Sequence, residues 1–255
     1  MNSKFTLNTY LDICTAIKES GYKLYTFKEY LDLDEPPKNK YLILRHDVDR
    51  FAYNSLNMAK LENDLDITST YYFRTSSQSF NKSVITKIKK MGHEVGYHYE
   101  DFAVSSGNFE KAIKRFKNNL KRFKDIGISI KTISMHGSPG RKNSSYDLWS
   151  KYDYKSSGIL GDANLDINYE SMYYFTDTGR SWKSKNNLRD YASNSLKHIV
   201  NTNEELISFI KNNESPIILQ THPERWSINL IQLTRSYLLD MMTNLIKKVY
   251  RKLYH

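Results

Sequence analysis

The stretch Arg45-His46-Asp47-Val48-Asp49 follows directly on the apolar run Tyr41-Leu42-Ile43-Leu44. A continuous apolar run that ends in charged residues is typical of a buried parallel strand whose carboxyl end reaches the rim of a sheet. Side chains alternate along a strand, so we expect Arg45, Asp47 and Asp49 on one face. Two carboxylates at the end of a buried strand are costly unless something pairs with them. This segment therefore predicts a parallel sheet with a polar site at its edge.

A second polar stretch, Gly92-His93-Glu94-Val95-Gly96-Tyr97-His98-Tyr99-Glu100-Asp101, follows a predicted helix. While this part of the chain stays extended, Glu94, His98 and Glu100 point to one side. Carboxylates together with imidazole suit a divalent metal such as zinc. A single Asp-x-Asp or a single buried histidine is more often structural, but the two stretches together, each at a strand end, predict a metal site.

Predicted strands alternate with predicted helices along the chain. The strands cover 41–49, 69–74, 93–99, 130–136 and 216–222, with weaker candidates near 156–160, 172–176 and 196–200. This alternation indicates a parallel sheet with helices outside it. Four of the strands end in acidic or imidazole groups, namely Asp47 and Asp49, His98 and Glu100, His136, and His222. Active sites of α/β barrels are built at the carboxyl ends of the strands, so we expect these groups at one rim.

Length and cysteine content bound the setting of the protein. With 255 residues the chain fits one domain of α/β barrel size, residues 1–255. Cys14 is its one cysteine, which excludes a disulfide framework and fits a reducing compartment. We find no secretory signal and no stretch that is apolar for the length of a membrane-spanning helix. We therefore expect a soluble, cytoplasmic protein, whose oligomeric state the sequence does not define.

The formal net charge of +10 raises the question of an anionic partner. The basic residues are scattered over separate predicted helices and accompany no nucleic-acid-binding motif, so we expect no nucleic-acid partner. Residues 228–253 form a basic amphipathic helix with Leu238, Met242, Leu245 and Val249 on one side. We expect this helix to pack on the barrel, and weak contact with a membrane surface is the alternative.

The strand-end motifs resemble those of the polysaccharide deacetylase family, also called the NodB-homology or carbohydrate esterase 4 (CE4) superfamily. Residues 45–49 resemble its first, aspartate-containing motif, and residues 92–98 resemble its Gly-His-Glu-x-x-x-His motif. Residues 136–139 stand where its third motif belongs, and Leu219-Gln220-Thr221-His222 resembles its last. The resemblance covers about residues 36–226.

A bacterial branch of this family, found with surface-polysaccharide genes, is the most similar. Its motifs Arg-His-Asp-Val-Asp, Thr-Asp-Thr-Gly-Arg and His-Pro-x-Arg-Trp stand here at 45–49, 176–180 and 222–226. The resemblance implies an α/β fold, a distorted (β/α)7-type barrel, to which the helix predicted over residues 228–253 adds a C-terminal helix. It also implies metal-assisted hydrolysis of an N-acetyl or related amide.

The resemblance assigns roles to the strand-end groups. Asp47 is the general base, and Asp49 and His98 are ligands of a divalent metal, with zinc as the expected ion. His222 is the acid that protonates the leaving amine, which is otherwise a poor leaving group.

Two positions depart from the family pattern. The second metal histidine of the family falls at Phe102 here. We assign the third ligand position to Glu100, which shares the His98 face in an extended chain, with Asp101 as the alternative. The third motif normally brings an arginine, and His136 stands there instead as a candidate catalytic group.

The loop 176–182 joins an acidic acceptor, a guanidinium and an indole. Sugar sites often combine polar hydrogen bonds with an aromatic platform, and arginine suits phosphate or carboxylate. Asp177, Arg180 and Trp182 are therefore candidate substrate contacts, with an internal Asp177–Arg180 pair as the alternative. Arg225 and Trp226, beside His222, are candidates for the same role or for closing the barrel.

We therefore expect a metal-dependent amide hydrolase that deacetylates an N-acetylated sugar or related amide in the building of lipopolysaccharide or capsule. The pathway rests on the resemblance alone. A non-catalytic carbohydrate-binding or assembly protein with a degenerate site is the main alternative, favoured by Phe102 and His136. A cyclic-amide hydrolase of the same superfamily is a third reading.

Overall fold

The computed structural model describes residues 5–138, 141–182 and 194–254. Parallel strands form one sheet in the order β6-β5-β4-β3-β2-β8-β7, and β1 pairs with β2. The strands are β1 (Lys23–Tyr25), β2 (Tyr41–Val48), β3 (Thr70–Phe73), β4 (Glu94–Tyr99), β5 (Thr132–Met135), β6 (Gly161–Asp162), β7 (Tyr173–Thr176) and β8 (Ile217–Thr221). The α-helices are α1 (Leu7–Glu19), α2 (Phe27–Leu31), α3 (Ala52–Asp64), α4 (Lys82–Lys90), α5 (Asp101–Val104), α6 (Phe109–Lys124), α7 (Asn203–Asn212) and α8 (Leu230–Tyr254). Short 3-10 helices are η1 (Ser145–Ser150), η2 (Tyr154–Ser157), η3 (Tyr169–Ser171) and η6 (Pro223–Arg225).

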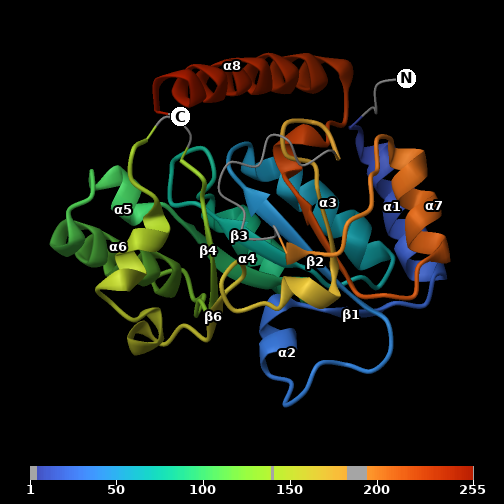
Figure 1. Ribbon diagram of the computed structural model, residues 1–255, viewed down its shortest axis with the longest axis horizontal. Coiled ribbons are helices and arrows are strands. Elements are labelled where there is room, and N and C mark those ends of the chain that lie inside the picture. Colours follow the sequence, from blue (N-terminus) through green and yellow to red (C-terminus); the bar gives the residue numbers. More distant parts are fainter. Residues whose placement is uncertain (1–4, 139–140, 183–193, 255) are drawn as a thin grey trace.

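The sheet is curved and surrounded by helices (Figure 1). β2 to β6 follow one another in chain order, while β8 adds to the other edge of β2 and β7 lies beyond it. Within the described ranges no pairing joins β6 to β7, so the barrel is open at this point. The expected distorted α/β barrel with a C-terminal helix is confirmed.

The weaker strand predictions have different outcomes. Residues 172–176 coincide with β7, but 156–160 do not form a strand. Residues 154–157 close into η2, whose first turn is capped by the Asp153 side chain, and the strand starts only at Gly161. In the range 196–200, Leu196 makes an isolated bridge to Tyr173 before the chain runs on to α7.

β2 is buried along its whole length, and its alternating side chains enter two different core clusters. Leu42 and Leu44 pack outward with residues of α1 and α7, while Tyr41 and Ile43 pack on the opposite face of the sheet. Each fully buried aliphatic side chain contributes about 1.5–3 kcal/mol. The core therefore fixes the register of β2, and with it the inward direction of the charged residues that continue the face of Tyr41 and Ile43.

α8 forms a separate layer beside the loop that follows β2 (Figure 1). The guanidinium of Arg50, in that loop, donates to Asp240 of α8 at 2.5 Å. The helix predicted over residues 228–253 agrees closely with the bounds of α8, Leu230–Tyr254. Of the residues that the structure describes, none lies in a helix long and apolar enough to cross a membrane.

Candidate active site

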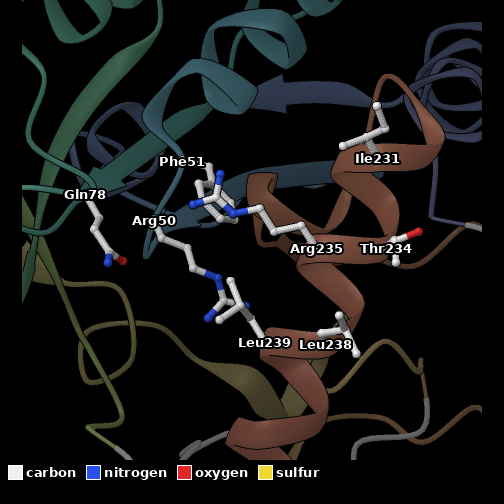
Figure 2. A pocket seen from close by; sticks show the side chains of 8 residues that line it. All are labelled: Arg50, Phe51, Gln78, Ile231, Thr234, Arg235, Leu238 and Leu239. Carbon is white, nitrogen blue, oxygen red and sulfur yellow. The ribbon is translucent and has the colours of Figure 1, made fainter.

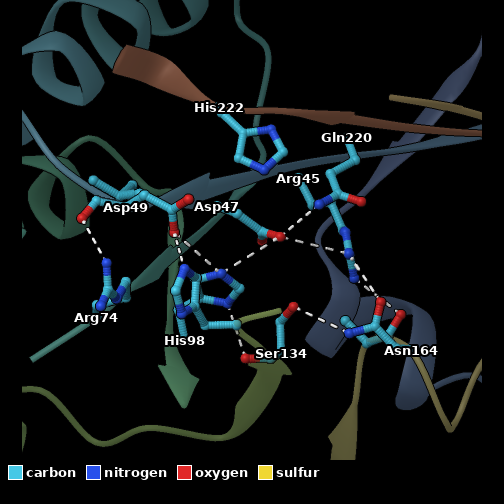
Figure 3. Close-up of polar contacts among 12 residues, drawn as sticks. Arg45, Asp47, Asp49, Arg74, His98, Ser134, Asn164, Gln220 and His222 are labelled. Atoms are coloured by element: carbon cyan, nitrogen blue, oxygen red, sulfur yellow. Dashed lines mark hydrogen bonds and ion pairs between the residues drawn. The ribbon is translucent and has the colours of Figure 1, made fainter. Parts of the chain in front are cut away.

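The end of β2 presents Asp47 to the inner face of the barrel (Figure 3). Its Oδ2 accepts a hydrogen bond from Gln220 Nε2 of β8 at 2.5 Å and lies 3.7 Å from the Arg45 guanidinium. Arg45 is itself anchored on the carbonyl oxygen of Ala163 at 3.0 Å. The other carboxylate oxygen, Oδ1, is buried and has no hydrogen-bond partner. Asp47 is therefore held through one oxygen, and the second is unpaired and can accept a proton.

Asp49 faces two imidazole rings. Its Oδ1 lies 3.4 Å from His98 Nε2 and 3.5 Å from His136 Nε2, and it is buried without a hydrogen-bond partner. The two rings meet edge to face, with centroids 5.3 Å apart. Donor atoms that share one tetrahedral ion at about 2.1 Å are separated by about 3.4 Å. The carboxylate thus stands at a metal-sharing separation from each imidazole.

Each of these imidazoles is oriented through its other nitrogen. Nδ1 of His98 donates to the carbonyl oxygen of Ser134 at 2.9 Å, and Nδ1 of His136 lies 3.0 Å from Glu100 Oε2. Both partners are acceptors, which places the proton on Nδ1 and leaves Nε2 as the lone-pair atom. Carbonyl and carboxylate partners of this kind are what orients metal-binding histidines.

The negative charge of Asp47 and Asp49 favours a positive charge beside them. Burial lowers the pKa of His98, but the carboxylates of Asp47 and Asp49 outweigh burial and raise it overall. Burial lowers the pKa of His136, which keeps this ring neutral near neutral pH. A neutral imidazole is the form that binds a metal.

Glu100 does not lie where the strand alternation predicted. β4 ends at Tyr99, and Glu100 turns to φ −142° and ψ 19° at the start of α5. Its two oxygens accept from the Arg74 guanidinium at 2.8 Å each, and one also contacts His136. Burial raises the pKa of Glu100, but His136 and Arg74 hold it at about 2. Glu100 therefore orients His136, and the place beside Asp49 and His98 that we assigned to Glu100 is occupied by His136.

The alternative ligand Asp101 lies away from this cluster. Its carboxylate is buried and accepts from Tyr97 and Asn119 at 2.7 and 2.8 Å. Phe102, at the position of the family's second histidine, is buried against Phe109 with ring centroids 4.6 Å apart. Neither position can supply a donor to the Asp49 cluster without rearranging the core.

Nowhere in residues 5–138, 141–182 and 194–254 do three His, Cys, Asp or Glu side chains form a complete metal site. Asp49, His98 and His136 are nevertheless the residues that would hold a divalent ion, because Asp49 Oδ1 is an unsatisfied buried acceptor near an imidazole nitrogen of each histidine. One carboxylate and two imidazoles are the donor types that zinc accepts while keeping an open position.

His222 follows β8, and its ring is directed toward Asp47, Asp49 and His98 (Figure 3). Its Nδ1 lies 2.6 Å from Asp177 Oδ1, and its backbone N–H donates to Asp177 Oδ2 at 3.0 Å. Burial and Arg225 lower the pKa of His222, but the Asp177 carboxylate outweighs them and raises it. The ring is thus fixed in one orientation and favoured as an acid.

Asp177 stays ionised despite complete burial. Burial raises its pKa, but Arg225 and His222 bring it to about 2. The Arg225 guanidinium and the Trp226 indole donate to its carboxylate at 2.7 and 2.9 Å. The motifs 176–180 and 222–226 therefore combine into one buried assembly behind His222.

The residues expected to contact substrate make contacts within the protein. Trp226 is 1% exposed, and Trp182 is buried beside Phe5 with ring centroids 5.8 Å apart. Arg180 donates to Asp240 of α8 at 2.7 Å instead of forming the internal pair with Asp177. Asp177, Arg180, Trp182, Arg225 and Trp226 are thus engaged in contacts within the protein, and their role in binding substrate stays a prediction.

Three participants were missed from the sequence. Arg74 ends the β-rich stretch 69–74 and Gln220 lies two residues before His222, so strand alternation could have placed both at the rim. Glu224 carried no such signal. Both of its carboxylate oxygens are buried without a hydrogen-bond partner, and burial together with Asp49 raises its pKa to about 7.

Comparisons with known proteins identify no family model and no curated protein that matches this chain. Solved structures do match. The Streptococcus pyogenes deacetylase PplD in complex with acetate is 16% identical over 61% of this chain and 78% of its own, with a TM-score of 0.44. The CE4 family pseudoenzyme BA3943 from Bacillus anthracis is 13% identical over 83% of this chain and 62% of its own, with a TM-score of 0.48. A family 4 carbohydrate esterase from the same organism is 15% identical over 98% of this chain and 88% of its own, with a TM-score of 0.42. At these levels of similarity, the roles of individual residues rest on the geometry of this chain.

Proposed function

We propose that this protein is a metal-dependent hydrolase that removes an N-acetyl or related acyl group from a saccharide used in bacterial surface polysaccharide, acting in the cytoplasm. One observation carries the proposal. A single strand-end cluster brings together the unpaired Asp47 oxygen, the donor set of Asp49, His98 and His136, and the Asp177-held His222. The saccharide and the pathway rest on the motif resemblance of residues 45–49, 176–180 and 222–226, and the compartment rests on the single cysteine, Cys14, which fits a reducing setting.

In the proposed reaction the protein's own groups handle the protons. Asp49, His98 and His136 would hold a divalent ion, which would supply Lewis acidity and lower the pKa of water. Asp47 Oδ1 accepts the proton of the water that attacks the amide carbonyl carbon. His222 donates a proton from Nε2 to the departing nitrogen, so the C–N bond breaks to give a neutral amine and a carboxylic acid. Gln220 and Asp177 keep the base and the acid in place.

The proposal is tested by acetate release from N-acetylated oligosaccharides, with and without added zinc. Asp47→Asn and His222→Ala should each lower kcat by about 100-fold or more, while zinc affinity stays near that of the wild type. Asp125→Asn, an exposed change at the C-terminal end of α6, is the matched control. Wild-type turnover in either site variant would remove the role assigned to that residue.

A non-catalytic carbohydrate-binding protein is the second candidate. The buried Phe102 and the lack of a complete three-ligand site among the described residues favour it. Saccharide binding by wild-type protein that neither binds zinc nor releases acetate would support this candidate over the hydrolase.

A further inference from the structure

α8 reverses the usual arrangement of a surface helix. Asp240 is 5% exposed and Ser236, one turn before it, is buried, whereas Ile231, Leu238 and Leu245 are 82%, 56% and 63% exposed. A surface helix normally buries its apolar side and exposes its polar side. Five exposed apolar residues of α8 form an outward stripe at helical spacing, which we call the α8 stripe: Ile231, Leu238, Met241, Met242 and Leu245.

Polar contacts hold the inner side of α8 on the barrel. Asp240 accepts from Arg50 at 2.5 Å and from Arg180 at 2.7 Å. Ser236 donates to the carbonyl oxygen of Glu224 at 2.5 Å and accepts from Arg180 at the same distance. These ion pairs and hydrogen bonds join the inner side of α8 to the barrel and leave the α8 stripe exposed.

A hollow of about 750 Å³ lies between α8 and the turn that follows β2 (Figure 2). Phe51, Ile231 and Leu238 supply apolar walls, and Arg50 and Arg235 supply cations. The Arg235 guanidinium lies over the Phe51 ring, 4.7 Å from its centroid. Among the described residues that line this hollow none is acidic, and its cations are Arg235 and Arg50, of which Arg50 is paired with Asp240.

The charge of α8 has the same sign. Its sequence contains Arg235, Lys247, Lys248, Arg251 and Lys252 against the single acid Asp240. That acid is already neutralised on the inner side by Arg50 and Arg180. Among the α8 residues whose side chains the structure describes, the outer side thus offers an anionic partner the exposed apolar stripe and the exposed Arg235, with no competing carboxylate.

We propose that the α8 stripe and the adjoining hollow dock on the surface of an anionic lipid bilayer. Apolar side chains beside lysine and arginine are the pattern by which a helix lies in a membrane interface, gaining both apolar burial and attraction to anionic lipid. A second copy of the chain is a poorer occupant. A two-fold interface would bring the same cationic helix of two +10 chains together. Docking does not depend on the proposed hydrolase activity.

Flotation of the full-length protein with lipid vesicles tests this proposal. Binding to vesicles of phosphatidylcholine with about one-third phosphatidylglycerol should exceed binding to pure phosphatidylcholine about tenfold or more. The double variant Leu238→Glu, Met242→Glu should lose at least about tenfold of the binding to anionic vesicles. Ile199→Glu is the matched control, because Ile199 is 78% exposed but lies outside α8, and it should bind like the wild type.

Sedimentation and thermal melting complete the test. Each variant should melt within a few degrees of the wild type, because the changed side chains are exposed. Absence of wild-type binding to anionic vesicles, or equal binding by the double variant, would overturn the proposal. So would a wild-type dimer that the double variant dissociates, because the α8 stripe would then be an interface between copies.

Discussion

At the scale of single residues, His136 and Glu100 divide one task. His136 Nε2 lies near Asp49, and Glu100 holds the opposite side of the same ring. We predict that His136→Ala weakens zinc binding more than 100-fold, as loss of a ligand should. Glu100→Gln should weaken it about 10–100-fold, the range of a residue that orients a ligand. Zinc titration of the metal-free proteins measures both.

Glu110→Gln, an exposed change on α6, serves as the control for loss of a carboxylate. If Glu100→Gln costs more affinity than His136→Ala, the original assignment of Glu100 as the ligand is restored. If the wild type binds no zinc, the proposed function itself falls.

Asp177 sets the acidity of His222, which leads to a pH prediction. The Asp177 carboxylate is what raises the pKa of His222 against burial and Arg225. Asp177→Asn removes that charge, so His222 should lose its proton at lower pH. Because His222 acts as the acid, the basic limb of the kcat profile should move to lower pH. An unmoved basic limb in Asp177→Asn, compared with Asp125→Asn as control, would mean that another group donates the proton.

Strand alternation in the sequence predicted the part of this site that β2 supplies. Arg45 and Asp47 share a face because they stand at alternate positions of β2, and Asp49 follows directly after its last residue. The same rule failed at Glu100, because β4 ends one residue earlier and the backbone turns into α5. It also could not reveal that His136, 36 positions further along the chain, occupies the vacated place. His136 can take this place because β5, which it follows, pairs with β4, which Glu100 follows.

At the scale of elements, a buried carboxylate joins α3 to β2 and β3. Glu62 of α3 accepts hydrogen bonds from Ser69 and Tyr71 at 2.6 and 2.9 Å and from Tyr10, and lies 3.0 Å from His46 Nε2. Removing one member of such a buried charged assembly leaves the others unpaired. We predict that Glu62→Gln lowers the free energy of unfolding by about 3 kcal/mol, measured by urea denaturation.

The role of Glu62 can also be measured through the pH dependence of the free energy of unfolding. Burial raises the pKa of Glu62, but its neighbours, led by His46, hold it at about 2 in the folded protein. The usual value is about 4.3, so its contribution is present above that pH and lost as the pH falls toward 2. In Glu62→Gln the free energy of unfolding should therefore fall less as the pH drops through this range. Asp64→Asn, exposed on the same helix, should change stability by less than about 0.5 kcal/mol and keep the acid dependence.

At the scale of the whole molecule, periodicity predicted the barrel but not how its parts connect. Alternating apolar strands and amphipathic helices indicate a parallel sheet wherever they occur, so the main strands were found. The short β6 was displaced because two residues between turns carry no periodic signal. Which side of α8 faces the barrel was also not predicted. Its apolar residues indicated a face packed on the barrel, whereas Asp240 and Ser236 face inward.

The inward side of α8 gives the last prediction. Three guanidiniums surround the Asp240 carboxylate: Arg50 at 2.5 Å, Arg180 at 2.7 Å and Arg225 at 3.7 Å. Asp240→Asn keeps the shape but leaves these cations without their shared anion, which disfavours the docked position of α8. We expect hydrogen exchange of α8 backbone amides to accelerate about tenfold or more, while β2 amides exchange as in the wild type. Met241→Gln, on the exposed side, should leave both unchanged. Unaltered α8 protection in Asp240→Asn would show that this ion cluster does not hold the helix, and that apolar packing contributes more to its position than the exposed α8 stripe suggests.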